Sequence, residues 1–348
     1  MTLTPRLILA ALLLAVAGPQ MAPAQGPVGA AIERSEQFNI NRQDIDLRQS
    51  LNEALETEDQ VQVPVLFPGE EADLGPQFIV RRVPKRKWID LLFDEQYFYT
   101  SNAFLSEPPV GETDTTLLIS TAQIAVAPSA FQVGEGALLP RVGFRYQWYN
   151  YGLGTDSTFV NNFDFDSMTV FTDVRYVWKD WIFGVGFDWN RLLGHEGPSA
   201  DYSEFYKEYV PAVYVTRVFN IDDRQQFYID WWADYRFTEV DAVPFFNITS
   251  DVNDRMDQNL RVTYTAEVYE NLFVQPFIRG QYTYYTEGAN SGRNDLFGSF
   301  GVTINYAITN WLSVRVFTNY DMRESDAPLI PDYENLNAGG GASVFLSF

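Results

Sequence analysis

The chain has 348 residues, a formal net charge of −22, no cysteine and 16% aromatic residues. The net acidity argues against binding to nucleic acid, because phosphate contacts depend on clustered Lys and Arg. The absence of cysteine excludes disulfides, thiolate metal sites and thiol nucleophiles. No apolar run is long enough for a membrane-spanning helix, and a chain so rich in aromatic residues is expected to fold rather than stay disordered.

Residues 1–24 have the features of a cleaved export signal. Arg6 supplies a short positive region, residues 7–18 are apolar, and Ala22-Pro23-Ala24 has the small-x-small pattern of a signal peptidase site. We therefore expect a mature chain that starts at Gln25 and leaves the cytoplasm. A buried N-terminal helix is the alternative, but the order of charge, apolar run and cleavage site favours the signal.

Residues 25–87 differ from the rest of the chain in composition and hydrophobic pattern, and they predict a periplasmic N-terminal extension. Leucine and isoleucine residues recur between acidic residues over 41–59, which predicts one short amphipathic helix. Four prolines interrupt residues 61–84, as is typical of an extended linker. A basic cluster over 81–87 is interpreted as part of that solvated linker, with contact to anionic lipid as the alternative.

From Trp88 onward the hydrophobic period is two. Over residues 168–178, for example, Val170 and Val174 alternate with Asp173 and Arg175. This alternation places one face of a strand in an apolar medium and the other in a polar one. Such runs predict twelve strands, at 88–100, 114–126, 140–152, 164–178, 181–191, 204–218, 225–238, 258–269, 272–285, 295–307, 311–321 and 339–348.

The connections between these strands alternate between short and long. Short ones fall at 179–180, 219–224, 270–271 and 308–310, and long polar ones separate the other strands. The connection 127–139 is the one that does not fit, because it should be short. The pattern predicts an all-β fold, an antiparallel up-and-down barrel with short periplasmic turns and long external loops, which occupies residues 88–348.

The two faces favour a barrel in a membrane over a soluble one. A soluble barrel would bury its apolar face as a core. Here the polar face carries charges with Gly and Thr, and the apolar face ends in aromatic residues, as in the aromatic girdles of a bilayer-spanning barrel. These aromatic residues are Trp148, Trp178, Trp181, Trp189, Trp231, Tyr235, Tyr282, Tyr284, Trp311 and Tyr320.

The last strand alternates from Gly341 and ends on Phe348. It resembles the closing strand of bacterial outer-membrane barrels, whose terminal aromatic residue is read by the barrel-assembly machinery. The segment Tyr99-Thr100-Ser101-Asn102-Ala103-Phe104 and the segment Thr309-Asn310-Trp311-Leu312-Ser313 are similar to motifs of the putative β-barrel porin family, with Ser101 in place of the usual acid. The resemblance covers 88–348 and implies a place in the outer membrane of a Gram-negative cell, in contact with its lipids.

The polar face of the barrel would form the lumen. Its charged positions are nearly balanced, so they form either a salt-bridged plug or a constriction that sets the selectivity of a pore, and both readings stay open. Bulky Phe171, Trp232 and Phe273 on the same face favour a narrow passage. The candidate pore-lining residues are Asp94, Arg141, Arg145, Asp173, Arg175, Asp188, Asp230, Asp234, Arg236, Arg261, Glu267, Arg279 and Arg315.

The net acidity is expected in the external loops, where it would favour cations at a pore mouth or simply keep the loops soluble. The acidic cluster over 251–257 looks like a calcium loop but lacks the turn glycine and the final glutamate, so we predict no metal site. The acids concerned are Glu107, Glu112, Asp114, Asp156, Glu196, Asp201, Glu239, Asp241, Asp251, Asp254, Asp257, Glu287, Asp326, Asp332 and Glu334.

No catalytic motif or cofactor site is apparent. The lone histidine, His195, is expected in a loop and lacks the His-x-Ser arrangement of outer-membrane lipases. We therefore predict a porin-like channel for passive diffusion of small solutes, and no enzyme. The alternative is a non-conducting surface barrel whose acidic loops bind a ligand or partner while salt bridges close the lumen. A soluble exported β protein is a third, weaker interpretation.

Overall fold

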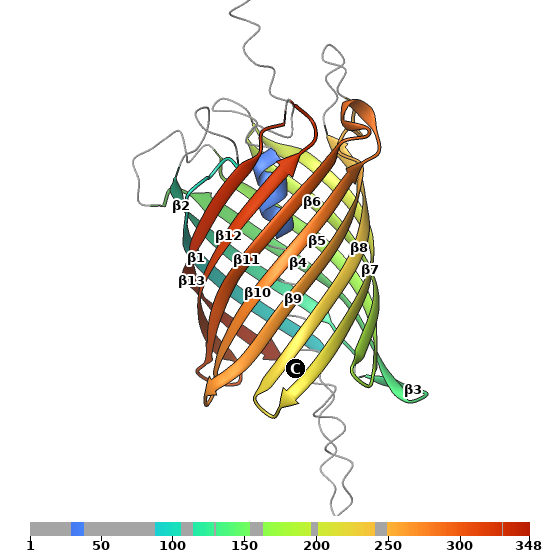
Figure 1. Ribbon diagram of the computed structural model, residues 1–348, viewed down its shortest axis with the longest axis vertical. Coiled ribbons are helices and arrows are strands. Elements are labelled where there is room, and N and C mark those ends of the chain that lie inside the picture. The colour runs from blue at the N-terminus through green and yellow to red at the C-terminus, as the bar shows by residue number, and fades with distance from the viewer. Residues whose placement is uncertain are drawn as a thin grey trace, which may run out of the picture.

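The computed structural model describes residues 29–37, 88–105, 114–128, 130–153, 163–195, 201–240, 249–328 and 330–348. Its strands form one antiparallel sheet that closes on itself, so that twelve long strands make a barrel (Figure 1). The strands are β1 (Ile89–Thr100), β2 (Thr115–Val126), β3 (Phe131–Val133), β4 (Gly136–Tyr151), β5 (Phe165–Trp178), β6 (Trp181–His195), β7 (Tyr202–Asp222), β8 (Gln225–Val240), β9 (Arg255–Tyr269), β10 (Leu272–Tyr285), β11 (Asn294–Ala307), β12 (Leu312–Ser325) and β13 (Tyr333–Ser347), with a 3₁₀ turn at Gly288–Asn290.

All twelve predicted strands are present, and the all-β barrel is confirmed. Connections 179–180, 223–224, 270–271 and 308–311 lie at one end of the barrel, which we call the turn end; the opposite end is the loop end. Lys179 and Asn271 adopt positive φ angles of 53° and 63°, which two-residue hairpin turns require. His195 is the last residue of β6, rather than part of a loop.

The irregular connection 127–139 has a structural cause. Strand β2 pairs directly with the later part of β4, while the short strand β3 pairs with the first residues of β4. The chain therefore adds a small hairpin that extends the turn end at β3 (Figure 1). This hairpin, not a long loop, accounts for the extra length.

The alternation of exposure confirms the predicted faces. Along β8, Tyr228, Asp230, Trp232, Asp234 and Arg236 are buried in the interior, and the residues between them point outward. The outward face is apolar, with side chains such as Val185 and Ile278 exposed by 58% and 60%. Continuous apolar exteriors of this kind are stable in contact with lipid and not with water.

No helix in the described parts of the chain has the length and apolarity needed to cross a membrane.

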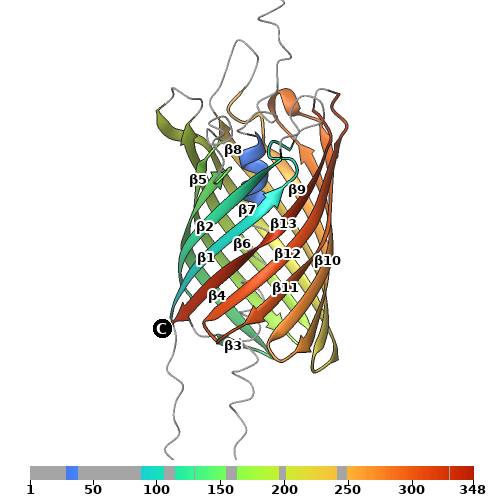
Figure 2. The same cartoon turned by 90° about the vertical axis from the view of Figure 1, so that its left-hand side faces the viewer.

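The barrel closes by pairing β1 with β13 (Figure 2). At the turn end the backbone N–H of Phe348 donates to the carbonyl of Ile89 (2.9 Å). Further along this seam, Arg315 of β12 donates two hydrogen bonds to Asp94 of β1, at 2.7 and 2.8 Å. The guanidinium crosses β13 beside Gly341, where a Cβ atom would lie 3.2 Å from Nη2 of Arg315 and only 2.5 Å from the backbone oxygen of Glu95 on β1. The glycine therefore leaves room for an ion pair that joins two strands across a third.

A short helix over residues 29–37 lies inside the barrel, near the loop end in both views (Figures 1 and 2). This helix was not predicted from the sequence. The helix expected over 41–59, the signal at 1–24 and the linker lie outside the described residues. The assignment of residues 25–87 to a periplasmic extension thus stays a prediction, while the barrel begins at Ile89, one residue from its predicted start.

Candidate functional site: the lumen and its helix

The helix 29–37 is bonded to the barrel wall in several directions. Arg34 donates to the side chains of Thr100 on β1 (2.7 Å) and Asn337 on β13 (3.1 Å), so it bridges the seam. Ser35 shares a hydrogen bond with Ser167 on β5, with their hydroxyl oxygens 3.2 Å apart. The helix acids face the other side, since Glu33 contacts Arg323 on β12, and Glu36 contacts Arg255 on β9 and Arg236 on β8. These contacts involve six strands, so the helix spans the lumen.

The helix also covers an apolar surface inside the lumen. Ala31 and Ile32 pack in one buried cluster with inward side chains from the loop end of β1, β2 and β4 to β7. In a water-filled lumen this surface would be exposed at a cost that scales with its apolar area. The helix is therefore the element that completes the core at the loop end. The barrel members of the cluster are Phe98, Ala103, Leu117, Ile119, Tyr149, Tyr151, Phe165, Leu192, Phe205 and Tyr206.

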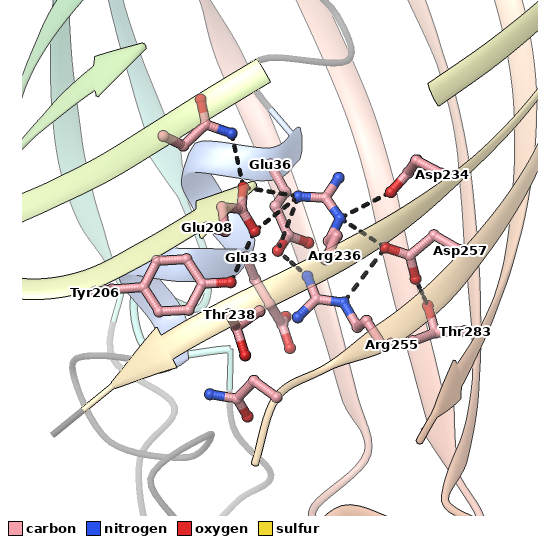
Figure 3. Close-up of polar contacts among 12 residues, drawn as sticks. Glu33, Glu36, Tyr206, Glu208, Asp234, Arg236, Thr238, Arg255, Asp257 and Thr283 are labelled. Atoms are coloured by element: carbon pink, nitrogen blue, oxygen red, sulfur yellow. Dashed lines mark hydrogen bonds and ion pairs between the residues drawn. The ribbon is translucent and has the colours of Figure 1, made fainter. Parts of the chain in front are cut away.

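A network of charges lies beside the helix (Figure 3). Arg236 binds Glu208 at 3.0 Å, Asp234 at 3.0 Å and Asp257 at 2.8 Å. Asp257 also accepts from Arg255 at 3.3 Å, and Glu36 of the helix lies between the two guanidinium groups. Buried charges are tolerated when they are paired in this way. Glu36 is thus a member of the wall network rather than an isolated helix acid.

A small cavity lies between the helix and strands β9 to β13. Glu33 and Glu36 line it from the helix, and Arg255, Arg279 and Arg323 line it from the wall. Its volume of about 60 Å³ holds only a few water molecules. The helix acids and the wall arginines therefore face one another across a small polar space.

Nearer the turn end, inward side chains of β4 and β5 pack on one another. The ring of Phe171 lies between Arg141 and Arg145, whose guanidinium carbons are 5.0 and 5.3 Å from its centroid. Asp173 pairs with Arg141 at 3.0 Å and with Arg175 at 3.1 Å. Aromatic and charged side chains thus form one packed layer here, which agrees with the narrow passage expected from Phe171.

All thirteen predicted pore-lining residues lie on the inward register of their strands. Glu267 is at the turn end, where it accepts a hydrogen bond from the backbone of Asn271 (3.0 Å). That these residues line a conducting pore stays a prediction. Eight of them are no more than 7% exposed, so they are covered by neighbouring side chains: Asp94, Arg145, Arg175, Asp230, Asp234, Arg236, Arg261 and Arg279.

Sequence reasoning missed the lumen residues near the loop end. The strand predicted to end at residue 321 is β12, which continues through Arg323 to Ser325. The strand predicted to begin at residue 258 is β9, which begins at Arg255. Two acids assigned to an external loop are buried instead. Asp254 accepts hydrogen bonds from the backbone and hydroxyl of Thr238 (2.6 and 2.8 Å), and Asp257 belongs to the charge network. The sequence pattern that could have placed these residues on a strand is the continued alternation of Arg255, Asp257 and Asn259 with the residues between them.

A closed antiparallel barrel with an apolar exterior and a charged lumen is the architecture of bacterial outer-membrane β-barrels, and this prediction is confirmed. No protein-family model and no curated protein sequence matches the chain, and the particular likeness to the putative β-barrel porin family stays a prediction.

Several solved structures are similar in fold. The beta domain of the Bordetella autotransporter BrkA shares 12% identity and a TM-score of 0.45, covering 76% of this chain and 99% of that one. An outer membrane channel from Pseudomonas putida F1 shares 11% identity and a TM-score of 0.46, covering 78% and 100%. The KdgM porin, solved with disordered oligogalacturonate, shares 8% identity and a TM-score of 0.35, covering 73% and 98%. At such identities the likeness concerns fold and says nothing of activity.

Proposed function

We propose that this protein is an outer-membrane channel for small solutes and that the helix 29–37 closes it in the state described here. The observation that supports this proposal is the docking of the helix to six strands around the lumen. An element bonded to opposite walls blocks passage. The helix is also a single nine-residue element, which can undock locally while the barrel stays folded.

The proposed location rests on the exterior of the barrel. Its apolar side chains would contact outer-membrane lipids, after export by a signal cleaved behind Ala24. The closing strand β13 with Phe348 would be the part that the barrel-assembly machinery binds. Diffusion through the open channel would be passive. A preference for cations, expected from the acidic loop end, stays a hypothesis. One such acid is Asp326, whose pKa is held below its usual range by hydrogen bonds from Asn294 (2.7 and 2.8 Å).

The test uses the contact between Ser35 and Ser167. Because the chain has no cysteine, the double variant Ser35→Cys, Ser167→Cys carries the only two thiols, placed where two hydroxyls already touch. Single-channel conductance in a planar bilayer would be recorded with the disulfide formed and after its reduction. We expect no openings from the oxidised protein and openings after reduction, while each single variant responds to neither treatment. A salt gradient in the same recording gives the ion preference.

Two results would contradict this proposal. Equal conductance in the oxidised and reduced states would mean that the helix does not close the channel. A barrel that is folded by heat-modifiable gel migration but silent in both states would favour the second candidate, a non-conducting surface barrel with a permanently filled lumen. The burial of the inward charges is the observation that favours that candidate.

A further inference from the structure

The barrel wall that faces Glu33 and Glu36 contains three pairs of an arginine and an aromatic ring. On strands β9 to β13, each arginine that lines the cavity lies near the ring of an aromatic residue on the adjacent strand. The guanidinium carbon is 5.7 Å from the ring centroid for Arg255 and Tyr285, 5.0 Å for Arg279 and Phe297, and 4.7 Å for Arg323 and Tyr333. These contacts restrain the guanidinium groups and leave N–H groups for a ligand.

Two of these three arginines, Arg279 and Arg323, have fewer acidic partners than Arg255, which pairs with both Asp257 and Glu36. Arg279 is 5% exposed, and among the described residues no carboxylate lies within ion-pair distance of it; it donates to Asn259 and Gln281. Arg323 is equally buried, its Nε has no hydrogen-bond partner, and Glu33 is its one carboxylate partner within the described ranges. Buried cations without anions are costly, so this pair of arginines favours an added negative charge.

Other acids nearby are already engaged. Asp257 is bound by Arg236 and Arg255, and Asp295 by Arg293. Asp321 accepts hydrogen bonds from Ser299, Asn319 and Asn337. The charge that reaches Arg323 therefore comes from the helix, and it would leave with the helix.

We propose that Arg255, Arg279 and Arg323 form a binding site for a small solute with negatively charged oxygens, a carboxylate or a phosphate, and that Glu33 and Glu36 occupy this site in the closed state. The inference rests on the proposed function, since the helix must leave for the solute to bind. Guanidinium groups bind both kinds of oxyanion through paired N–H donors. Solute and helix then compete, and binding of the solute favours the open channel by mass action.

The test measures binding rather than conduction. Isothermal titration of the refolded Ser35→Cys, Ser167→Cys protein in detergent would use succinate, inorganic phosphate and glucose as probes, with the helix locked by the disulfide or released by reduction. We expect an oxyanion to bind the reduced protein at least tenfold more tightly than the oxidised one, and glucose to bind neither. Tighter binding of succinate would assign the site to carboxylates, and tighter binding of phosphate to phosphates.

Two variants locate the site. Arg279→Met should lose most of the binding, and it should fold because it removes a buried cation that lacks an acid. Glu33→Gln should increase affinity, because it frees Arg323 and weakens helix docking. Arg224→Gln, in the exposed turn between β7 and β8, is the matched control and should leave binding unchanged.

The inference fails if oxyanions bind the locked and released proteins equally, if only glucose binds, or if Arg279→Met binds like the control. Because no current is measured, a silent barrel with competitive oxyanion binding would refute the channel and keep this site. A gated channel that binds no oxyanion would support the channel and refute the oxyanion site.

Discussion

At the scale of single residues, the lumen is packed by pairing large side chains with glycine. Phe171 can lie between Arg141 and Arg145 because the residue between those arginines on β4 is Gly143. A Cβ atom there would be 2.4 Å from the Phe171 ring and 2.6 Å from the carbonyl oxygen of Ile124. Tyr214 lies over Gly184 and Gly186 on β6 in a similar way. These glycines let aromatic rings cross the strand at short range, which fills a small lumen.

We therefore expect Gly143→Ala to destabilise the barrel. Because one contact is with backbone, the strand must shift, and overpacking of this kind costs about 1–3 kcal/mol. Gly280→Ala on β10 is the matched control, since a Cβ there meets nothing within 4 Å. Urea unfolding of both variants in lipid vesicles measures the difference. Equal stabilities would show that Phe171 has room to move.

The ion pair at the seam offers a second residue-scale prediction. Asp94→Asn removes the negative charge that pairs with Arg315, whose side chain is 8% exposed and also donates to Ser343 at 2.7 Å. Removing one partner of a buried pair costs roughly 3–5 kcal/mol, so we expect a large loss of stability. A double-mutant cycle with Arg315→Gln, followed by urea unfolding, separates the pair from general damage. Additive effects of the two substitutions would argue against direct coupling.

At the scale of elements, the helix 29–37 illustrates what local sequence cannot specify. Nine residues are too few for a stable helix in water, because the free energy needed to form the first turn exceeds the free energy gained from the few hydrogen bonds that follow. Docking supplies the difference through Ile32, Arg34 and the helix acids. The segment has ordinary helix-forming residues but no amphipathic period long enough to recognise. Only the presence of the wall makes it helical.

Ile32→Gln should release the helix while leaving the barrel intact. Burying an isoleucine side chain contributes about 1.5–3 kcal/mol, so its loss should increase undocking by roughly 10- to 100-fold. In a background with Ser35→Cys as the single thiol, the rate of thiol labelling reports undocking. Glu270→Gln in the distant turn is the control and should label as slowly as the parent. An unchanged rate in Ile32→Gln would mean that the polar contacts alone hold the helix.

At the scale of the whole molecule, the exterior was predictable and the lumen only in part. Strict alternation around residues such as Val170 and Asp173 fixes which side chains point outward, because a shift by one residue would reverse both faces. Near the loop end acidic residues become frequent and were interpreted as loop, so Arg323 and Asp257 were placed outside their strands although the alternation continues through Met256 and Met322. The filling of the lumen by residues 29–37 depends on contacts hundreds of residues apart, and no local pattern records them.

The membrane assignment predicts a dependence on depth. Ile278, in the middle of β10, and Ile221, near the turn end of β7, are both 60% exposed on the outside. Ile278→Arg should cost about 2–4 kcal/mol of folding free energy in vesicles, and Ile221→Arg about 0–1 kcal/mol, because the arginine near the interface reaches water. Equal and small costs would instead indicate an exterior in contact with water.

The position of Arg34 at the seam has a consequence for the order of folding. Strands β1 and β13 contain the pair Asp90 and Ser347, which are 257 residues apart, and Arg34 reaches Asn337 across 303 residues. Contacts of such long range carry the highest loop-closure cost and form late. Arg34 binds Thr100 on one strand of the seam and Asn337 on the other, so its full set of contacts forms only when the two free edges of the sheet have come together. We therefore expect the segment to dock last and become helical as it docks, so that it fastens a seam that has already closed.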